Sequence, residues 1–266
     1  MSKLEQIANS DFIITFGTML ADNKENYRDS IIESIAKNDT QFIYMHPVDN
    51  IDLKLYYNQF IKYEVGSEEG VCALLLDTFV KDSTPTIQEY IDDLDLGYIS
   101  AESSAGEEEF EEACEKAAQF STKTLIIGDD LIEHERIENI VKFLAIIKKY
   151  SDLNVVVLNE SLEQKINSCE NFDLQEVEDL KSYDGTLVYK LIDENEKDEL
   201  IASQTFANVA KVQDGNKIVI NTSSEKIEKT IKVDDKLHGT VAILKTNENI
   251  LDGYRYKQVK IEKVGA

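Results

Sequence analysis

The sequence predicts an α/β protein: an open, mostly parallel sheet with flanking helices, followed by a small β-barrel domain. Apolar residues run from Phe12 to Phe16 and end at Gly17, where a parallel strand would give way to a ligand-facing loop. A second apolar run, 41–47, follows at the spacing of a βαβ crossover. From Gly185 onward, short strands and turn signals replace the helical pattern.

The first part of the chain alternates strands with helices. After the strand before Gly17, residues 27–37 have a helical pattern, and 41–47 form the second strand. A helix is expected at residues 67–79, with Ser67 as its N-cap. Glu68 and Glu69 suit the positive end of the helix dipole, so these two acids need no catalytic role. Further along, helices are expected at 106–120 and 135–150 and buried strands at 123–127 and 153–158.

In the second part of the chain, short strands replace the alternation of strands and helices. Strands are expected at 186–192, 217–220, 226–233, 240–244 and 258–263. Turns fall at Asp214-Gly215-Asn216 and at Gly239. A closed barrel is the natural architecture because closure removes exposed strand edges. We therefore predict two domains, an α/β domain at 1–182 and a barrel domain at 183–266.

Composition excludes several classes of function. The 266 residues carry 52 acidic and 28 basic side chains, a formal charge of −24, which would repel nucleic acid and anionic lipid surfaces. No stretch approaches the roughly 20 apolar residues of a membrane span, and no basic segment leads into an apolar one at the start. We expect a cytoplasmic protein with no nucleic acid partner and no direct membrane insertion.

The three cysteines predict no metal centre. Cys72, Cys114 and Cys169 lie far apart, without a Cys-x-x-Cys pair or a histidine placed to complete a zinc site. An iron–sulfur cluster held only by cysteines takes four thiolates, so this chain cannot hold one alone. Cys72 and Cys114 fall on apolar helix faces and are interpreted as core residues, and an odd count fits a reducing compartment.

Other chemical signals are weak. His46, His134 and His238 lie on separate elements without a nucleophile elbow, so structural or surface roles are favoured. Among 52 acids, the pairs Asp129-Asp130 and Asp92-Asp93 are best explained as chance neighbours rather than a magnesium site. The glycine loops carry neither a Walker lysine nor a Gly-x-Gly-x-x-Gly run. We predict no catalytic residues and no metal ligands.

The order of the segments resembles the second half of the molybdopterin oxidoreductase family, over nearly the whole chain. That family has a strand ending in a glycine–threonine or glycine–serine loop, a second strand ending in an aspartate–proline–arginine motif, a loop into an apolar helix, and a Val-Ile-x-Gly strand before a long helix. The matching stretches here are Phe16-Gly17-Thr18, Tyr44-Met-His-Pro47, Val65 to Val71 and Leu125-Ile-Ile-Gly128. The tail from Ser203 to Val219 is similar to the family's C-terminal dinucleotide-binding barrel.

Within the family, the chain most resembles the G subunits of NADH-quinone oxidoreductase, respiratory complex I, of the epsilonproteobacterial type. The His46-Pro47 pair and the closing stretch 253–261 carry this resemblance. It implies a molybdopterin-type region kept as a scaffold without the metal. Iron–sulfur clusters would lie only in regions that precede the stretch matched here, and the sequence leaves open whether its start is natural or a cut.

Departures from the family pattern predict that the cofactor loops are degenerate. Catalytic members hold a pterin guanine dinucleotide, whereas the charged pair around the proline is replaced here by Met45, His46 and Val48, and the usual asparagine after the first glycine by Thr18. The degenerate pterin-loop positions are Gly17, Thr18, His46, Gly66 and Gly128. We expect no cofactor in this chain.

These observations predict a non-catalytic scaffold that packs against other peripheral-arm subunits of complex I, cytoplasmic and peripheral to the inner membrane. One alternative is the half of a molybdenum oxidoreductase that binds molybdopterin guanine dinucleotide and is completed by another chain. Another is a stand-alone module that binds a small ligand at the strand ends of its sheet.

Overall fold

The chain folds into two compact units, each with its own sheet and core. A computed structural model describes residues 1–21, 24–193, 197–222, 225–247 and 249–264. The first unit comprises Met1–Leu20, Lys24–Pro47 and Leu53–Ser182. The second comprises the described residues from Tyr183 on, with Ala21 and Val48–Asp52.

The first unit is built on a five-stranded parallel sheet in the order β3-β2-β1-β4-β5. Its strands are β1 (Phe12–Phe16), β2 (Gln41–Met45), β3 (Gln59–Ile61), β4 (Lys123–Ile127) and β5 (Leu153–Val157). From β1 the chain builds β2 and β3 on one side and then crosses to β4 and β5 on the other. The predicted open parallel sheet is confirmed, and it contains one short edge strand, β3, that the sequence pattern did not reveal.

The strands are apolar because both faces of the sheet are covered. All five residues of β1 are buried, with Phe12, Ile14 and Phe16 in one core cluster and Ile13 in another. Such a strand must be apolar at consecutive positions instead of alternating with polar residues. For this reason the apolar stretch before Gly17 could be predicted to be a buried strand.

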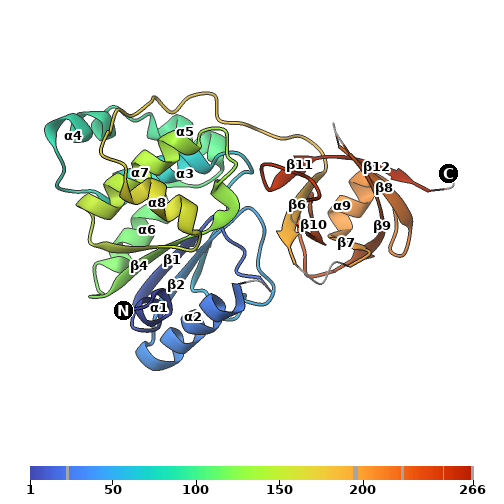
Figure 1. The fold of residues 1–266 in the computed structure, drawn as a ribbon, viewed down its shortest axis with the longest axis horizontal. Helices are drawn as coiled ribbons and strands as arrows, with labels where there is room; N and C mark the ends of the chain where they lie inside the picture. Colours follow the sequence, from blue (N-terminus) through green and yellow to red (C-terminus); the bar gives the residue numbers. More distant parts are fainter. Residues whose placement is uncertain (22–23, 194–196, 223–224, 248, 265–266) are drawn as a thin grey trace. The chain divides into compact units, whose positions relative to one another are not determined.

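Helices cover both faces (Figure 1). One face carries apolar side chains from α3 (Glu68–Phe79), α4 (Pro85–Asp92), α5 (Leu96–Ser103), α6 (Glu107–Ala117), α7 (Ile137–Tyr150) and α8 (Glu160–Asn167). The other face packs against α1 (Lys3–Ala8) and α2 (Glu25–Asn38). The unit therefore has three layers, with its larger core on the side of α3 and α7.

Four short helices of this unit, α1, α4, α5 and α8, were not expected from periodicity, yet each begins at a capping residue. The Ser2 hydroxyl accepts a hydrogen bond from the Glu5 amide, Thr84 from the Ile87 amide, and Asn159 from the Leu162 amide. Such caps satisfy amides that the first helical turn leaves without partners. In helices of six to eight residues the cap is a stronger signal than the apolar stripe.

The second unit is a nearly closed barrel of seven strands with mixed pairing, in the order β11-β6-β10-β7-β9-β8-β12. Its elements are β6 (Leu187–Ile192), β7 (Glu199–Ala202), α9 (Gln204–Ala210), β8 (Lys217–Asn221), β9 (Lys226–Val233), β10 (Val241–Thr246), β11 (Tyr256–Gln258) and β12 (Lys260–Lys263). The predicted barrel is confirmed. The strand expected at 258–263 is divided at Val259, whose amide donates to the Thr186 carbonyl, so its two halves pair with β6 and β8.

Candidate functional site

The predicted loop residues lie at one edge of the parallel sheet. Gly17 and Thr18 follow β1, His46 follows β2, Gly66 precedes α3, and Gly128 follows β4. Ligands of open α/β sheets bind at the carboxyl ends of the strands, in the crevice where the strand order reverses. Here that crevice lies between the loops after β1 and β4.

The chain itself fills this crevice. A methyl group on Gly128 would lie 2.0 Å from the Gly17 carbonyl oxygen and 2.3 Å from Cβ of Thr18. Gly17 has a φ of +67°, and a Cβ there would lie 2.8 Å from Cγ of Leu131. Leu131, on the short turn η2 (Asp129–Leu131), is fully buried. Both glycines are therefore explained by backbone packing and need no ligand.

Three backbone amides of these loops already have acceptors within the protein. The Gly128 amide donates to the Phe16 carbonyl (2.8 Å), and the Asp130 amide donates to the Gly17 carbonyl (3.1 Å). The Leu20 amide donates to the Thr18 hydroxyl (3.1 Å). A bound phosphate needs amides that point into the ligand space. These three bind the two loops internally instead.

His46 and Asp130 form a buried pair at the same edge. Nε2 of His46 lies 3.2 Å from Oδ2 of Asp130, and the His46 ring stacks on Tyr44. Neighbouring Asp129 lies 3.7 Å from the Lys24 ammonium. Asp130 thus has a structural role that its sequence neighbours did not indicate, because its carboxylate joins the loops after β2 and β4.

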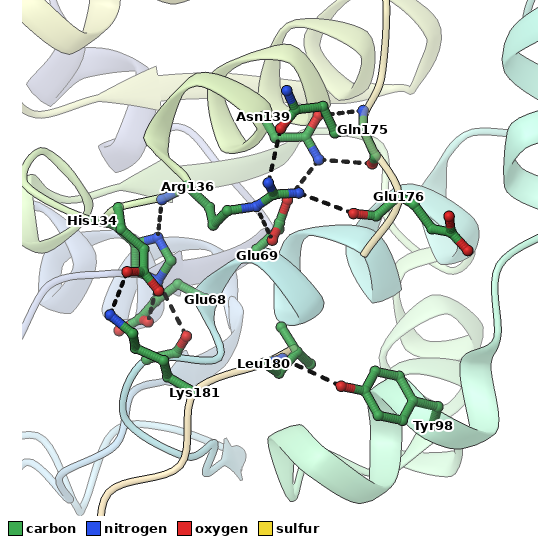
Figure 2. Close-up of polar contacts among 12 residues, drawn as sticks. Glu68, Glu69, Tyr98, His134, Arg136, Asn139, Gln175, Glu176, Leu180 and Lys181 are labelled. Atoms are coloured by element: carbon green, nitrogen blue, oxygen red, sulfur yellow. Dashed lines mark hydrogen bonds and ion pairs between the residues drawn. The ribbon is translucent and has the colours of Figure 1, made fainter. Parts of the chain in front are cut away.

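Two further acids are buried at the start of α3 (Figure 2). Glu68 Oε2 lies 3.3 Å from His134 Nε2, which also lies 3.1 Å from the Gly66 carbonyl oxygen. The Arg136 amide donates to His134 Nδ1 (3.0 Å), which assigns the proton of a neutral ring to Nε2. The expected structural role of His134 is confirmed, whereas His238 is exposed.

Glu69 is the centre of a second network (Figure 2). Its carboxylate accepts hydrogen bonds from Arg136 Nε (2.8 Å) and Asn139 Nδ2 (2.6 Å), and its side chain is 1% exposed. A buried carboxylate is tolerated only with such partners. Glu68 and Glu69 were expected simply to suit the helix end, with Ser67 as its cap. Instead they bind other elements, and Ser67 donates to the Glu64 carbonyl.

The nucleophilic groups near this edge are held in their protonated forms. Burial, with the negative charges of Glu68 and Asp130, raises the pKa of Tyr63 well above its usual value. Burial, with the charges of Glu69 and Glu68, does the same for the pKa of Cys72. Cys72 is confirmed as a core residue, and Cys114 is half-buried. Neither Tyr63 nor Cys72 is set up as a base or a thiolate.

The acidic charge is concentrated in residues 1–182, the part of the chain that contains the α/β unit. Residues 1–182 contain 38 acidic and 15 basic side chains, a formal charge of −23, whereas 183–266 contain 14 and 13. The negative electrostatic potential that this charge creates disfavours binding of a ligand that carries several phosphate charges. Among the described residues, no group of three or more His, Cys, Asp or Glu side chains is placed to hold a metal ion. In the same residues, no helix has the length and apolar character needed to span a bilayer.

The chain is a doubly wound α/β unit followed by a barrel. At the carboxyl edge of the parallel sheet, the crevice between the loops after β1 and β4 is filled by the protein's own atoms. No family model and no curated protein matches the sequence. Among solved structures the chain is similar to acetylene hydratase from Pelobacter acetylenicus, with a TM-score of 0.52 and 6% identity over 91% of this chain and 73% of that one. At this identity the likeness concerns the fold alone.

The filled crevice does not suit the dinucleotide that the sequence resemblance implies. The space between the Gly17 and Gly128 loops is taken by their own atoms and by Leu131, and their amides donate to protein oxygens. The positive charges nearest the edge, on Lys24 and Arg136, face Asp129 and Glu69. The close contact of the two glycine loops and the three amides that donate within them therefore do not suit a phosphate at this crevice.

Proposed function

We propose that this chain is a non-catalytic scaffold domain of the G subunit of NADH-quinone oxidoreductase, with a molybdopterin-type fold that works without a molybdenum site. The self-filled crevice between β1 and β4 is the observation that carries the proposal. The resemblance of the Gly17, His46, Gly66 and Gly128 segments to the family supports its place in that complex. The chain would lie in the cytoplasm, peripheral to the inner membrane through the complex.

A scaffold acts by packing against partners, and other peripheral-arm subunits are the proposed ones. The loop after β2 presents two adjacent apolar side chains to solvent, Leu55 at 95% and Tyr56 at 37% exposure. Exposed apolar side chains that lie next to each other are typical of partner contacts. We assign this loop tip to the contact with a sister subunit.

Affinity capture from a host that assembles the complex tests the proposal. The tagged chain should recover sister peripheral-arm subunits, and Leu55→Asp should recover at least tenfold less, on the scale of a hot spot worth about 1.4 kcal/mol or more. Val209→Asp, which alters an exposed valine of the barrel unit, is the matched control and should capture as the wild type does. Recovery of the wild-type chain without any sister subunit would contradict the proposal.

The alternative, a half-enzyme that binds molybdopterin guanine dinucleotide together with a second chain, is favoured only by the fold likeness to an enzyme. It requires the loops at Gly17 and Gly128 to separate on binding. The hydrogen bonds of Gly128 and Asp130 to the β1 loop would have to break. Stoichiometric pterin in the isolated protein would favour this alternative.

A further inference from the structure

The segment between α8 and the barrel unit lies fixed on the α/β unit as an extended strap, residues 171–181 (Figure 2). It has no regular secondary structure, so helix or strand hydrogen bonds do not hold it in place. Most of its side chains are exposed, and Val177 is the one that is buried. What fixes the strap is a set of hydrogen bonds to side chains of α4, α5 and α7 and of Arg136, together with the partly buried Phe172, Leu174 and Leu180, which pack against the core.

Asn139 binds the backbone of the strap in both directions. The Gln175 amide donates to Asn139 Oδ1 (2.9 Å), and Asn139 Nδ2 donates to the Gln175 carbonyl (3.0 Å). Tyr90 Oη donates to the same carbonyl (2.7 Å). Because Asn139 is 2% exposed and also bonds Glu69, its orientation is set by the core of the unit.

Arg136 completes the attachment. Its Nη1 donates to Gln175 Oε1 (2.9 Å) and its Nη2 to the Glu176 carbonyl (2.9 Å), while its Nε bonds Glu69. At the far end of the strap the Leu180 amide donates to Tyr98 Oη (3.3 Å), and the Leu180 side chain lies against α3 at Gly70. The buried Glu69 carboxylate therefore orients Arg136 and Asn139, two of the side chains that hold the strap.

We infer that the strap is a lock that opens separately from the sheet it lies on and, when open, lengthens the free chain between α8 and the barrel unit. A segment without helix or strand hydrogen bonds opens at lower free energy than such a sheet, and the strap buries Val177 and, in part, Phe172, Leu174 and Leu180. With the lock closed, the free chain is limited to Ser182, because the chain from Tyr183 on belongs to the barrel unit. With it open, residues 169–182 are free, and their root-mean-square reach is about 21 Å.

Hydrogen exchange on the full chain tests the inference. Gln175→Pro removes the amide that donates to Asn139 and the side-chain oxygen that accepts from Arg136, and it leaves the hydrogen bonds of Arg136 and Asn139 to Glu69 in place. We expect amides in 171–181 to exchange on the order of tenfold faster, while those of β1 and β4 keep their protection. Glu176→Ala is the matched control, because Glu176 joins the lock through its backbone carbonyl, and it should exchange as the wild type does.

Two results would overturn the inference. Unchanged protection of 171–181 in Gln175→Pro would mean that Asn139 does not hold the strap. Loss of protection in the strap and in β1 and β4 together would mean that the strap is part of the core and cannot be released alone. Tyr90→Phe provides a second variant, because it removes the hydroxyl that donates to the Gln175 carbonyl and leaves the partners of Glu69 unchanged, and the same separation between strap and sheet is expected there.

Discussion

Replacing Arg136 by methionine is expected to lower the free energy of unfolding of the α/β unit by about 3 kcal/mol. Glu69 is 1% exposed, and Arg136 is the cation bonded to its carboxylate at 2.8 Å. Removing one partner of a buried pair costs more than the pair itself contributes, because the remaining charge stays desolvated. Urea denaturation followed by circular dichroism would measure the loss.

The matched control is Lys165→Met, which removes a lysine paired with Glu138 at 3.4 Å on the surface. An exposed pair of this kind contributes about 0.5 kcal/mol or less, so the control should unfold close to the wild type. The double variant Glu69→Met with Arg136→Met should recover part of the loss, because it leaves no buried charge. Equal effects of Arg136→Met and Lys165→Met would contradict the role given to Glu69.

Gly128→Ala is expected to destabilise the same unit by about 3 kcal/mol, at the upper end of the cost of overpacking. The added methyl group would meet two backbone atoms of Gly17, its carbonyl oxygen at 2.0 Å and its carbonyl carbon at 2.5 Å. Neither atom can move aside without separating the loops after β1 and β4. Soluble yield and the urea midpoint of the purified variant would measure the effect.

Gly97→Ala is the control for this substitution. Gly97 lies in helix α5, is exposed, and a Cβ there would approach Asp95 Oδ1 at an ordinary 3.7 Å. Alanine in a helix is favoured over glycine by roughly 0.5–1 kcal/mol, so this variant should be slightly more stable than the wild type. A Gly128→Ala protein as stable as Gly97→Ala would show that the two loops are not in contact.

The sequence was informative where burial constrains many consecutive residues. The strand before Gly17 and the strand 123–127 had to be apolar on both faces, and helix α7 had to carry an apolar stripe. Each of these elements could therefore be predicted from the sequence pattern. The edge strand β3 has three residues and pairs only with β2, so it leaves too short a pattern to recognise. Caps such as Thr84 before Pro85 were the available signal for the short helices.

Only part of the candidate site could be predicted from the sequence, because the positions of its loops follow from the topology but their contacts do not. Parallel strands bring their carboxyl ends to one edge, so the positions of Gly17, His46 and Gly128 followed from the predicted topology. What the loops do there depends on partners far away in sequence. Nothing local distinguishes Glu69, bound to Arg136 across 67 positions, from the exposed glutamates of helix α6.

The closed crevice gives one explanation for several features of this edge. A loop that faces a ligand needs free amides and space, whereas here glycine, Leu131 and the buried carboxylates bind the loops to one another. The same groups that would receive a phosphate now stabilise the fold. A scaffold that must hold its shape within a larger complex benefits from such an edge.

Molybdenum and pterin content test the central claim most directly. The full chain would be purified from a host that makes the molybdopterin dinucleotide, analysed for molybdenum by mass spectrometry, and assayed for the fluorescence of released, oxidised pterin. A folded molybdenum oxidoreductase from the same host would serve as the positive control. The account predicts neither molybdenum nor pterin above background in a well-folded protein, whereas one pterin per chain would contradict it.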